Sequence, residues 1–548
     1  MKCIINALAF FISMTLFVSC NNPDQDLNIL YVDIQNGSDN NSGRSKEEAL
    51  QTITTAYSII QPGDKLVILP GIYYERSILD ELAATRDQPI HIVADIPGET
   101  VISGVWKETA EGKIIWKDEG NGIFSVEKSF PSLFAWTEDH HMLYRYMTLD
   151  HLMNEIVPSR DRYGLFKGPS TGFAYQDGKI YLKLPGDEDP NGKKIMFSLP
   201  SFGEEPTERL MIINSPYVIL DGIRFQGTGT YGVTFTKPNC IIRNCIFEYC
   251  REGAAMYDNS LMEWCEYSYP GLYDLVEETK QINDGNIKIY PMAKDYHPRN
   301  WYEGSIAYPY LPDGTNSRSP RNFEIRQCFI HECFDGLLLG GFDDSEAHHN
   351  VFQNCYDNHV EIETWTEAGL SVNLHFHHNL LLSCPYGPIS HQEPGKLKGP
   401  HFVYNNVVIG YDNHGWEPWT LIKSKCYGIG RGFYYYHNLF WVKSAIPYWN
   451  NEEWPQEWLK TFDFRNNIFV FSEEMRRPWG PEGSEYYFQS GGNLMVAENY
   501  DENVMRGFLR NGGIHLNTIE EVKFEDPSHL NFNLLPDSPA IDNGMEIE

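Results

Sequence analysis

A short pattern recurs along the middle of the chain and constrains the fold more than any other feature. Each copy starts with Gly, Cys or Asn, continues with β-branched or aromatic residues, and often ends in Cys. The copies are 23, 83, 22, 29, 27, 32 and 29 residues apart, and all but one of these spacings suit one coil of a solenoid. They begin at Gly222, Cys245, Cys328, Asn350, Asn379, Asn406, Asn438 and Asn467.

The repeats are built from strands. They lack a 3.6-residue period and are rich in β-branched and aromatic residues, which favours an all-β solenoid over helical repeats. Polar residues precede the repeated Asn, as at a turn: His348-His349, His377-His378 and Asn405. In the alignment, one column of Cys residues predicts an interior ladder of small apolar side chains, formed by Cys250, Cys333, Cys355 and Cys384.

The flanking segments differ in pattern from the repeats. The long spacing indicates an aromatic-rich loop insertion, and alternating strands with turn clusters indicate a separate β-rich subdomain. The predicted organisation is a signal peptide at 1–20, a tether at 21–28, an N-terminal start and cap at 29–105, an inserted subdomain at 106–205, coils at 206–475 with a loop insertion at 259–320, and a C-terminal cap region at 476–548.

The N-terminus reads as an export signal. Lys2 is followed by an apolar run too short for a membrane span, and Leu16-Phe17-Val18-Ser19-Cys20 resembles a bacterial lipoprotein cleavage box. Cys20 is then the lipidated first residue of the mature chain. We expect an exported protein that is lipid-anchored to the cell envelope, on the periplasmic or the surface face of the outer membrane.

Charge and aromatic content narrow the partners. The net charge is −32, which argues against nucleic acid and anionic lipid surfaces. Aromatic residues make up 14% of the chain, including 33 Tyr and 13 Trp. They suit either stacking on sugar rings or packing in the core, so a glycan is the expected partner.

Two stretches carry a family resemblance. The opening Tyr31-Val-Asp, Asn36-Gly-Ser-Asp and Pro62-Gly-Asp-Lys-Leu-Val-Ile-Leu-Pro-Gly resembles exported right-handed parallel β-helix proteins, as does the closing Leu535-Pro-Asp-Ser-Pro-Ala-Ile-Asp. The resemblance implies the pectate-lyase-like fold, a class that holds many polysaccharide lyases and glycoside hydrolases. Fold alone does not fix the activity.

Residues 357–363 are the main pointer to a site. Strict alternation along one strand puts Asp357, His359, Glu361 and Glu363 on one face. We expect these four, together with Asp335 from the preceding coil, to be the catalytic residues.

The alignment also stacks acids from successive coils. Glu252, Asp335 and Asp357 each follow the interior Cys by two residues. Such a stack raises the pKa of one member, as an acid catalyst requires. Acids on adjacent coils suit a retaining glycosidase, and acids at i and i+2, such as Glu361 and Glu363, suit an inverting one; the second is favoured.

A narrower resemblance concerns β-helical β-xylosidase-like hydrolases, which pair an Asp ending one coil's strand with a Glu one coil later. Gly336-Leu-Leu-Leu-Gly340 is similar to the first element, but Gly340 stands where that family has Asp. Val360-Glu361-Ile362-Glu363 is similar to the second element. The resemblance therefore implies a catalytic role for either Glu361 or Glu363.

Several alternatives stay open. The predicted substrate-binding residues are Trp365, Trp416, Glu417, His391, Lys423 and Arg431. No cofactor is expected, although Asp357, Glu361 and Glu363 offer the hard oxygen ligands that Ca²⁺ prefers. A polysaccharide lyase would use Ca²⁺ or Lys and Arg, and a noncatalytic glycan-binding protein is a third class. His375 and His377 share a strand face, but two ligands are too few to define a metal site.

Overall fold

The structure is a computed structural model of the 548-residue chain. It describes residues 28–129, 131–158, 165–198, 209–272, 274–275, 304–310, 319–363, 372–384, 386–394, 399–410, 418, 420–427, 432–450, 462–476 and 488–542.

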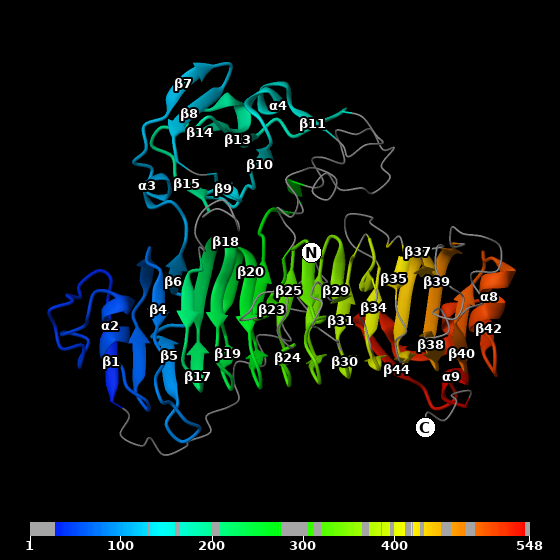
Figure 1. The fold of residues 1–548 in the computed structure, drawn as a ribbon. Helices are drawn as coiled ribbons and strands as arrows, with labels where there is room; N and C mark the ends of the chain where they lie inside the picture. Colours follow the sequence, from blue (N-terminus) through cyan, green and yellow to red (C-terminus); the bar gives the residue numbers. More distant parts are fainter. Residues whose placement is uncertain are drawn as a thin grey trace.

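The chain winds into a right-handed parallel β-helix, as the repeat and the resemblance predict (Figure 1). A 13-stranded parallel sheet forms one side. Its strands, in order, are β1 (Ile29–Val32), β2 (Lys65–Ile68), β5 (Ile90–Ala94), β17 (Val218–Asp221), β19 (Ile241–Arg243), β21 (Leu261–Glu263), β24 (Glu324–Arg326), β27 (Glu346–His348), β30 (Leu374–His377), β33 (His401–Tyr404), β36 (Phe433–Tyr436), β38 (Phe462–Arg465) and β40 (Gln489–Gly491).

A second sheet bends around the rest of each coil. Its first part comprises β3 (Gly71–Tyr73), β4 (Ser77–Leu79), β6 (Thr100–Ser103), β16 (Met211–Ile213), β18 (Ile223–Phe235), β20 (Ile246–Met256), β22 (Glu266–Ser268), β23 (Ala307–Pro309), β25 (Phe329–His331), β28 (Val351–Gln353), β31 (Leu380–Leu382), β34 (Val407–Ile409), β37 (Leu439–Asn450), β39 (Ile468–Met475), β41 (Leu494–Ala497) and β42 (Ile514–Leu516). Four further strands form a third face: β26 (Asp335–Leu338), β29 (Asn358–Glu363), β32 (Ile389–Pro394) and β35 (Thr420–Tyr427). The long strand β37 joins both parts, because its first half pairs with β34 and its second half with β35.

The polar residue before each repeat turns the corner between the first two sheets. His349 has φ +55°, His378 φ +54° and Asn405 φ +54°. This left-handed conformation is one that Asn, Asp and His adopt more readily than other residues with a Cβ. The predicted turn position is therefore confirmed.

One buried column runs along the interior behind these turns. Asn350, Asn379, Asn406, Asn438, Asn467 and Asn493 stack so that each of the first five Nδ2 groups donates to the Oδ1 of the next residue at 3.0–3.1 Å. The second Nδ2 hydrogen goes to a main-chain carbonyl, as from Asn406 to Phe376 at 2.9 Å. The ladder satisfies polar groups that would be costly to bury unpaired.

The cysteines extend this packing. Cys328 donates its main-chain N–H to Asn350 Oδ1, so Cys occupies the same column one coil earlier. In the predicted second ladder, Cys333 Sγ lies 3.5 Å from Cys355 Sγ, and both side chains are buried. Cys250 and Cys384 are buried as well. Burial raises the pKa of the Cys250 thiol, which suits structural rather than nucleophilic cysteines.

The solenoid continues further than the spacing predicts. Strands β21 and β22, with Cys265 between them, complete a regular coil inside the predicted loop insertion at 259–320. From the same insertion, β23 pairs with β20 and so adds a strand beside the third face. Tyr267 and Tyr269 are core residues rather than loop aromatics. In the predicted cap region, Asn493, β40 and β41 form a further coil.

Residues 106–129, 131–158 and 165–198 form smaller sheets above the β-helix, near β18 and β20 (Figure 1). Trp136 stacks on Tyr249 of β20 with ring centroids 3.8 Å apart, which ties this part to the coils. The elements are α3 (Lys107–Ala110), β7 (Lys117–Gly120), β8 (Ile123–Glu127), β9 (Ala135–Thr137), β10 (Tyr144–Tyr146), α4 (Leu149–Asn154), β11 (Ile156–Pro158), β12 (Leu165–Lys167), β13 (Gly172–Gln176), β14 (Lys179–Lys183), η1 (Pro185–Asp187) and β15 (Ile195–Phe197).

Both ends of the stack carry non-repeat elements. The helix α2 (Ile53–Ile59) lies at the N-terminal end and α8 (Glu502–Phe508) at the C-terminal end (Figure 1). The last elements are η4 (Ile519–Val522), β43 (Phe524–Asp526), η5 (Pro527–His529), β44 (Asn531–Leu534) and α9 (Pro539–Asp542). Among the described helices, none is long and apolar enough to cross a membrane.

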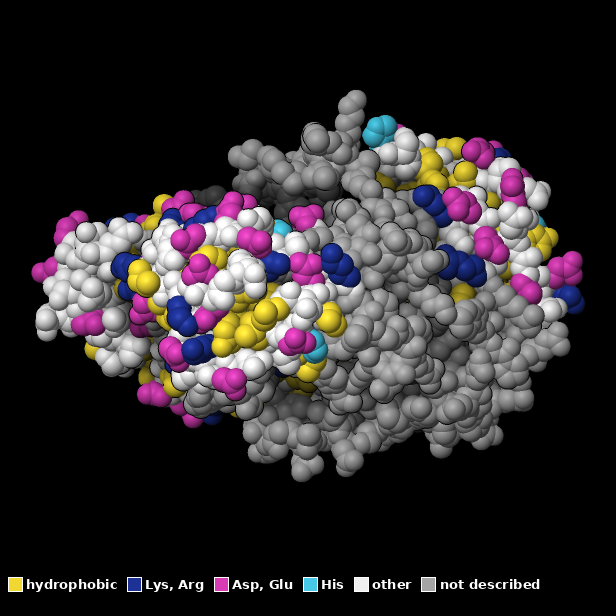
Figure 2. Space-filling model, turned by 90° about the horizontal axis from the view of Figure 1, so that it is seen from above, with side chains coloured by type: hydrophobic (Ala, Val, Ile, Leu, Met, Phe, Trp, Pro, Cys, Tyr) yellow, Lys and Arg dark blue, Asp and Glu magenta, His cyan; other side chains and the backbone are white. Residues whose placement is uncertain are grey.

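The surface is mixed in charge. Figure 2 looks down on the molecule from above and shows acidic and basic side chains interspersed over the described atoms, with no continuous basic tract in that view. The absence of a basic tract in this view is in line with the net charge of −32.

Candidate functional site

Three carboxylates meet on the third face of the coils. Asp335 begins β26, and Asp357 and Glu361 come from the next coil. One oxygen from each carboxylate lies within 4.8 Å of the others. Asp335 and Asp357 are buried, and Glu361 is partly exposed. The predicted clustering of these three residues is therefore present in the structure.

Asn358 links two of the acids. Its Nδ2 group donates to Glu361 Oε1 at 2.8 Å and lies 3.3 Å from Asp335 Oδ1. The register places Asp335 beside Asn358 across the two coils. This amide fixes the position of the Glu361 carboxylate.

The expectation that His359 shares this face is wrong. The main-chain N–H groups of His359 and Val360 both donate to Pro388 O, at 3.0 and 3.1 Å. Two residues thus oppose one on the next coil, which is the geometry of a β-bulge, and the alternation slips by one residue. His359 and Val360 are consequently both buried, whereas Glu361 reaches the surface.

His359 packs in the core against Phe352, with ring centroids 5.9 Å apart. Burial lowers its pKa to about 3, and the nearby main chain at Leu382 and Ser383 only partly offsets that effect. The imidazole is therefore neutral at ordinary pH and sits away from the acids. It has no place in the candidate chemistry.

Lys423, predicted to bind substrate, lies next to the acid cluster. It is fully buried on β35, and its Nζ lies 3.9 Å from Asp357 Oδ1. The ammonium also lies over the Tyr386 ring, 4.5 Å from the centroid. The register aligns Glu361 with Ser390 and Ser390 with Lys423, so the cation is two coils from Glu361.

Glu252 is a buried carboxyl with a strongly raised pKa. Burial raises its pKa to about 7, and the charge of Glu361 adds to this rise. Three interactions act in the opposite direction: the charge of Arg251, the Ser305 N–H that donates to Oε2 at 2.9 Å, and the Ser305 hydroxyl. The predicted stack of Glu252 on Asp335 is not formed, because Ser305 and β23 lie between their coils. The raised pKa of Glu252 comes mainly from burial.

Aromatic and cationic side chains flank Glu252. Tyr231 aligns with Glu252 in the register, and its ring lies 6.0 Å from that of Tyr308. The Arg209 guanidinium lies over the Tyr231 ring at 5.5 Å. Burial and the charge of Glu252 raise the pKa of the Tyr308 hydroxyl, and the charge of Glu361 adds to that rise.

His391 is not a surface residue, contrary to expectation. It aligns with the buried Ile362 and is itself fully buried among Phe433 and Phe462. Its Nε2 bonds to the Tyr435 hydroxyl, and burial lowers its pKa well below the ordinary value. The His391 side chain therefore packs in the core and does not face a substrate.

Other predicted site residues lie outside the described part of the chain. These are Cys20, Trp365, Trp416, Glu417 and Arg431, together with the side chain of Glu363.

The acid cluster fits a divalent cation in donor type. Asp335, Asp357 and Glu361 offer hard oxygen ligands close enough to share one ion. The predicted set of Asp357, Glu361 and Glu363 is thereby changed, since Asp335 is in the described cluster. Lys423 beside Asp357 already supplies a positive charge there and would compete with a cation.

Sequence reasoning missed two participants. The role of Asn358 depends on the bulge at His359 and Val360, and no residue type in the sequence predicts that bulge. Glu252 was placed in the acid stack by the repeat alignment but was not chosen as catalytic. The signal in the sequence was that Glu252 shares one column of the repeat alignment with Asp335 and Asp357.

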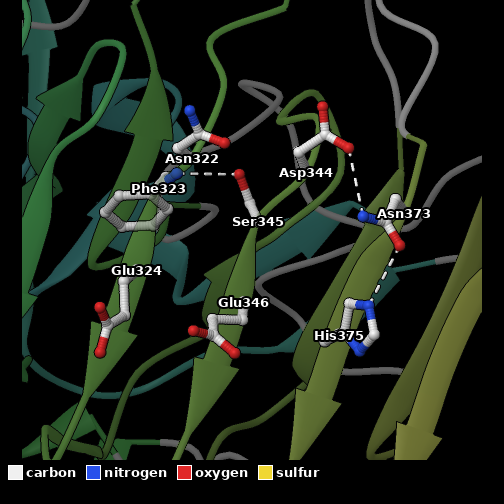
Figure 3. Close-up of a pocket in the computed structure, with 8 residues that line it drawn as sticks. All are labelled: Asn322, Phe323, Glu324, Asp344, Ser345, Glu346, Asn373 and His375. Atoms are coloured by element: carbon white, nitrogen blue, oxygen red, sulfur yellow. Dashed lines mark hydrogen bonds between the residues drawn. The ribbon is translucent and has the colours of Figure 1, made fainter.

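A second polar surface lies on the outer side of the first sheet (Figure 3). Glu324, Glu346 and His375 stand side by side on β24, β27 and β30. A shallow pocket here is lined by Asn322, Phe323, Glu324, Asp344, Ser345, Glu346, Asn373 and His375.

The chain matches no family model and no curated protein. Among solved structures it is similar to XylC in complex with xylose, with a TM-score of 0.50 and 12% identity over 89% of this chain and 86% of XylC. A structure described as a glycoside hydrolase gives a TM-score of 0.45 and 12% identity over 88% of this chain and 99% of the other. Pectate lyase Pel9A gives 0.37 and 11%, over 95% and 92%.

At these identities the likeness shows the fold. The chain has the parallel β-helix of the pectate-lyase-like class, in agreement with its opening and closing motifs.

Proposed function

We propose that this protein is a carbohydrate-degrading enzyme, and specifically a glycoside hydrolase that works on the third face of its coils. The observation that carries the proposal is Glu252, a buried carboxyl with a pKa near 7 that feels the charge of Glu361 from the Asp335, Asp357 and Glu361 cluster. Two carboxyl groups held in unlike environments are the requirement for acid-assisted cleavage of a glycosidic bond. The names of the structural neighbours support the broader activity.

In the proposed mechanism, Glu252 is the general acid. Its Oε2 accepts from Ser305 N–H, so Oε1 carries the proton. That proton passes to the glycosidic oxygen as its bond to the anomeric carbon breaks. General acid catalysis of this kind contributes about 10²–10⁴-fold to the rate.

Glu361 is the partner carboxylate. Asn358 orients its Oε1, and its partial exposure lets substrate reach it. It either attacks the anomeric carbon, which gives retention, or takes a proton from the attacking water, which gives inversion. Asp335 shares the Asn358 amide with Glu361, and the Lys423 ammonium beside Asp357 offsets part of the negative charge of the cluster.

The test is to measure new reducing ends with the purified protein on a panel of glycans. Glu252→Gln and Glu361→Gln should each lower turnover about 10²–10⁴-fold while glycan binding persists. Glu502→Gln, an exposed glutamate on α8, is the matched control and should act like wild type. Wild-type turnover in both site variants would rule the mechanism out. Retained glycan without any wild-type product would instead favour a noncatalytic binding protein.

A polysaccharide lyase is the second candidate, favoured by the buried Lys423 and its neighbour Tyr386. An amine and a phenol so placed can serve proton abstraction and donation in β-elimination. A lyase would form unsaturated products that absorb in the ultraviolet, and Lys423→Met would abolish them. If Ca²⁺ on the acid cluster neutralises the substrate carboxylate, EDTA should abolish the same signal.

We further propose that the chain is exported and anchored through Cys20, with a glycan rather than nucleic acid as its partner. The support is the sequence Leu16-Phe17-Val18-Ser19-Cys20 and the net charge of −32. Palmitate labelling of cells expressing the wild type should label the protein, and Cys20→Ala should remove the label. Equal labelling of both would contradict the anchor.

A further inference from the structure

The outer face of the first sheet gathers His and Glu side chains across three coils. The register puts Glu324 beside Glu346, and Arg326, His348 and His377 in one line. One ligand atom each from Glu324, Glu346 and His348 lies within 4.8 Å of the other two. Figure 3 shows the two carboxylates on neighbouring strands.

The hydrogen bonds around His348 require either a proton or a cation between His348 Nε2 and Glu324 Oε1. His348 Nδ1 lies 2.7 Å from His349 Nδ1, so one of these two nitrogens must donate to the other. If His348 donates, its Nε2 presents a lone pair to Glu324 Oε1 at 3.1 Å. Two acceptors at that distance require a positive centre between them.

We propose that Glu324, Glu346 and His348 bind a divalent transition-metal ion of the Zn²⁺ type. The site is separate from the acid cluster of the third face and does not rest on the proposed hydrolase activity. Mixed imidazole and carboxylate donors favour Zn²⁺ over Ca²⁺, which prefers oxygen ligands alone.

The spacing of the donor atoms fits such an ion. Zn–N and Zn–O bonds of about 2.0–2.1 Å put tetrahedral ligand atoms about 3.3 Å apart. The His348 Nε2 to Glu324 Oε1 distance of 3.1 Å is close to this value. The three ligand atoms lie within 4.8 Å of one another, so the Glu side chains must move inward to bind one ion.

Two further histidines support the ligands. His377 Nε2 lies 3.3 Å from Glu346 Oε2, and the His377 ring stacks on that of His348 with centroids 5.0 Å apart. His377 Nδ1 lies 2.8 Å from His378 Nδ1, so His377 Nε2 can donate to Glu346 when His378 supplies the proton of that contact. His349 forms a hydrogen bond with His348 through the Nδ1 atoms of the two rings. Such outer contacts set the tautomer and orientation of metal ligands.

The Arg326 guanidinium competes with a metal ion for Glu324. Its Nη1 lies 2.8 Å from Glu324 Oε1, while its Nε and Nη2 bond to Glu263 Oε2 at 3.0 and 2.7 Å. Metal binding must displace the first contact, and Glu263 retains the guanidinium. Removing the Arg326 charge should therefore strengthen metal binding.

Calorimetric titration of the untagged full chain with ZnCl₂ at pH 7, after EDTA treatment and dialysis, tests the proposal. The wild type should bind one Zn²⁺ that Ca²⁺ in excess does not displace. His348→Gln and Glu346→Gln should each weaken binding at least tenfold, and His349→Gln by about tenfold. Arg326→Gln should tighten it.

His375→Gln is the matched control. His375 aligns with Glu346 but bonds to Asn373 Oδ1 at 3.1 Å, so its loss should leave affinity unchanged. Glu361→Gln should also leave Zn²⁺ affinity unchanged, because it alters only the acid cluster. The proposal is overturned if the wild type binds no Zn²⁺, or if His348→Gln and Glu346→Gln bind it as the wild type does. Circular dichroism of each variant establishes that it is folded.

Discussion

At the scale of the residue, the site depends on how burial separates two carboxyl groups of the same chemical type. Glu252 is buried and holds its proton to about pH 7. Glu361 is partly exposed and hydrogen-bonded by the Asn358 amide. The environment, rather than the side chain, assigns the proposed roles of acid and partner.

This separation predicts the pH dependence of activity. The acid form of Glu252 is required, so kcat/KM should fall as pH rises through about 7, the pKa of that group. A pH profile of kcat/KM on the best glycan substrate measures this limb. Glu252→Gln should remove it from the residual activity.

Ser305→Ala is the control for this profile. The main-chain N–H of residue 305 still donates to Glu252 Oε2, so only the weaker hydroxyl contact at 3.4 Å is lost. The limb should stay near pH 7. A limb that persists unchanged in Glu252→Gln would assign the titration to another group.

His359 makes a second residue-scale prediction, on stability. Its folded pKa of about 3 lies below the unfolded value of about 6.5, so the unfolded chain binds more protons between these values. The stability linked to this histidine is therefore fully present above about pH 6.5 and is lost as pH falls toward 3. His359→Leu should reduce the loss of stability between pH 7 and pH 4 by at least about 1 kcal/mol.

Urea unfolding at the two pH values measures this difference, and turnover at pH 7 should be near that of the wild type. Loss of turnover in a folded, stable His359→Leu would return the imidazole to the catalytic residues, as alternation along the strand first indicated.

At the scale of the element, most of the fold follows from the sequence and part of the site does not. The Asn column and the turn residues before it repeat at a recognisable spacing, because the coils from Asn350 onward bury an amide at the same position. Asp335, Asp357 and Glu361 could be grouped from that spacing. The bulge at His359 and Val360 could not, because it depends on how the Pro388 carbonyl meets two amides of the neighbouring coil.

The Asn ladder yields an element-scale prediction. Asn406 is buried and bonds to Asn379, Asn438 and the Phe376 carbonyl. Asn406→Ala leaves buried partners unsatisfied and should lower the free energy of unfolding by about 3 kcal/mol, at about 1–3 kcal/mol per orphaned group. Urea unfolding measures the change.

Asn154→Ala is the comparison, because Asn154 is exposed at the end of α4. A surface change of this kind should alter stability by no more than about 0.5 kcal/mol. Equal effects of the two substitutions would mean that the ladder adds no stability beyond ordinary surface hydrogen bonds.

At the scale of the whole molecule, the chain is a one-dimensional stack whose coils contact mainly their neighbours. Stability in such a stack is a sum of local terms, and the ends need covering. At the C-terminal end, Phe508 of α8 packs on Phe464, Phe469 and Phe488, with ring centroids 5.4, 5.0 and 4.5 Å apart. This helix covers coils that would otherwise expose their core.

Phe508→Ala should therefore loosen one end of the molecule and leave the other intact. Loss of a buried Phe costs about 3–5 kcal/mol, and the neighbouring coils should absorb most of it. Hydrogen exchange followed by mass spectrometry should show lost protection in β38 to β42 and wild-type protection in β17 to β21. Met153→Ala, an exposed residue of α4, should change neither region. Uniform loss of protection along the stack would instead mean that the coils unfold as one cooperative unit, because local coupling alone cannot carry the effect of one end cap through every strand.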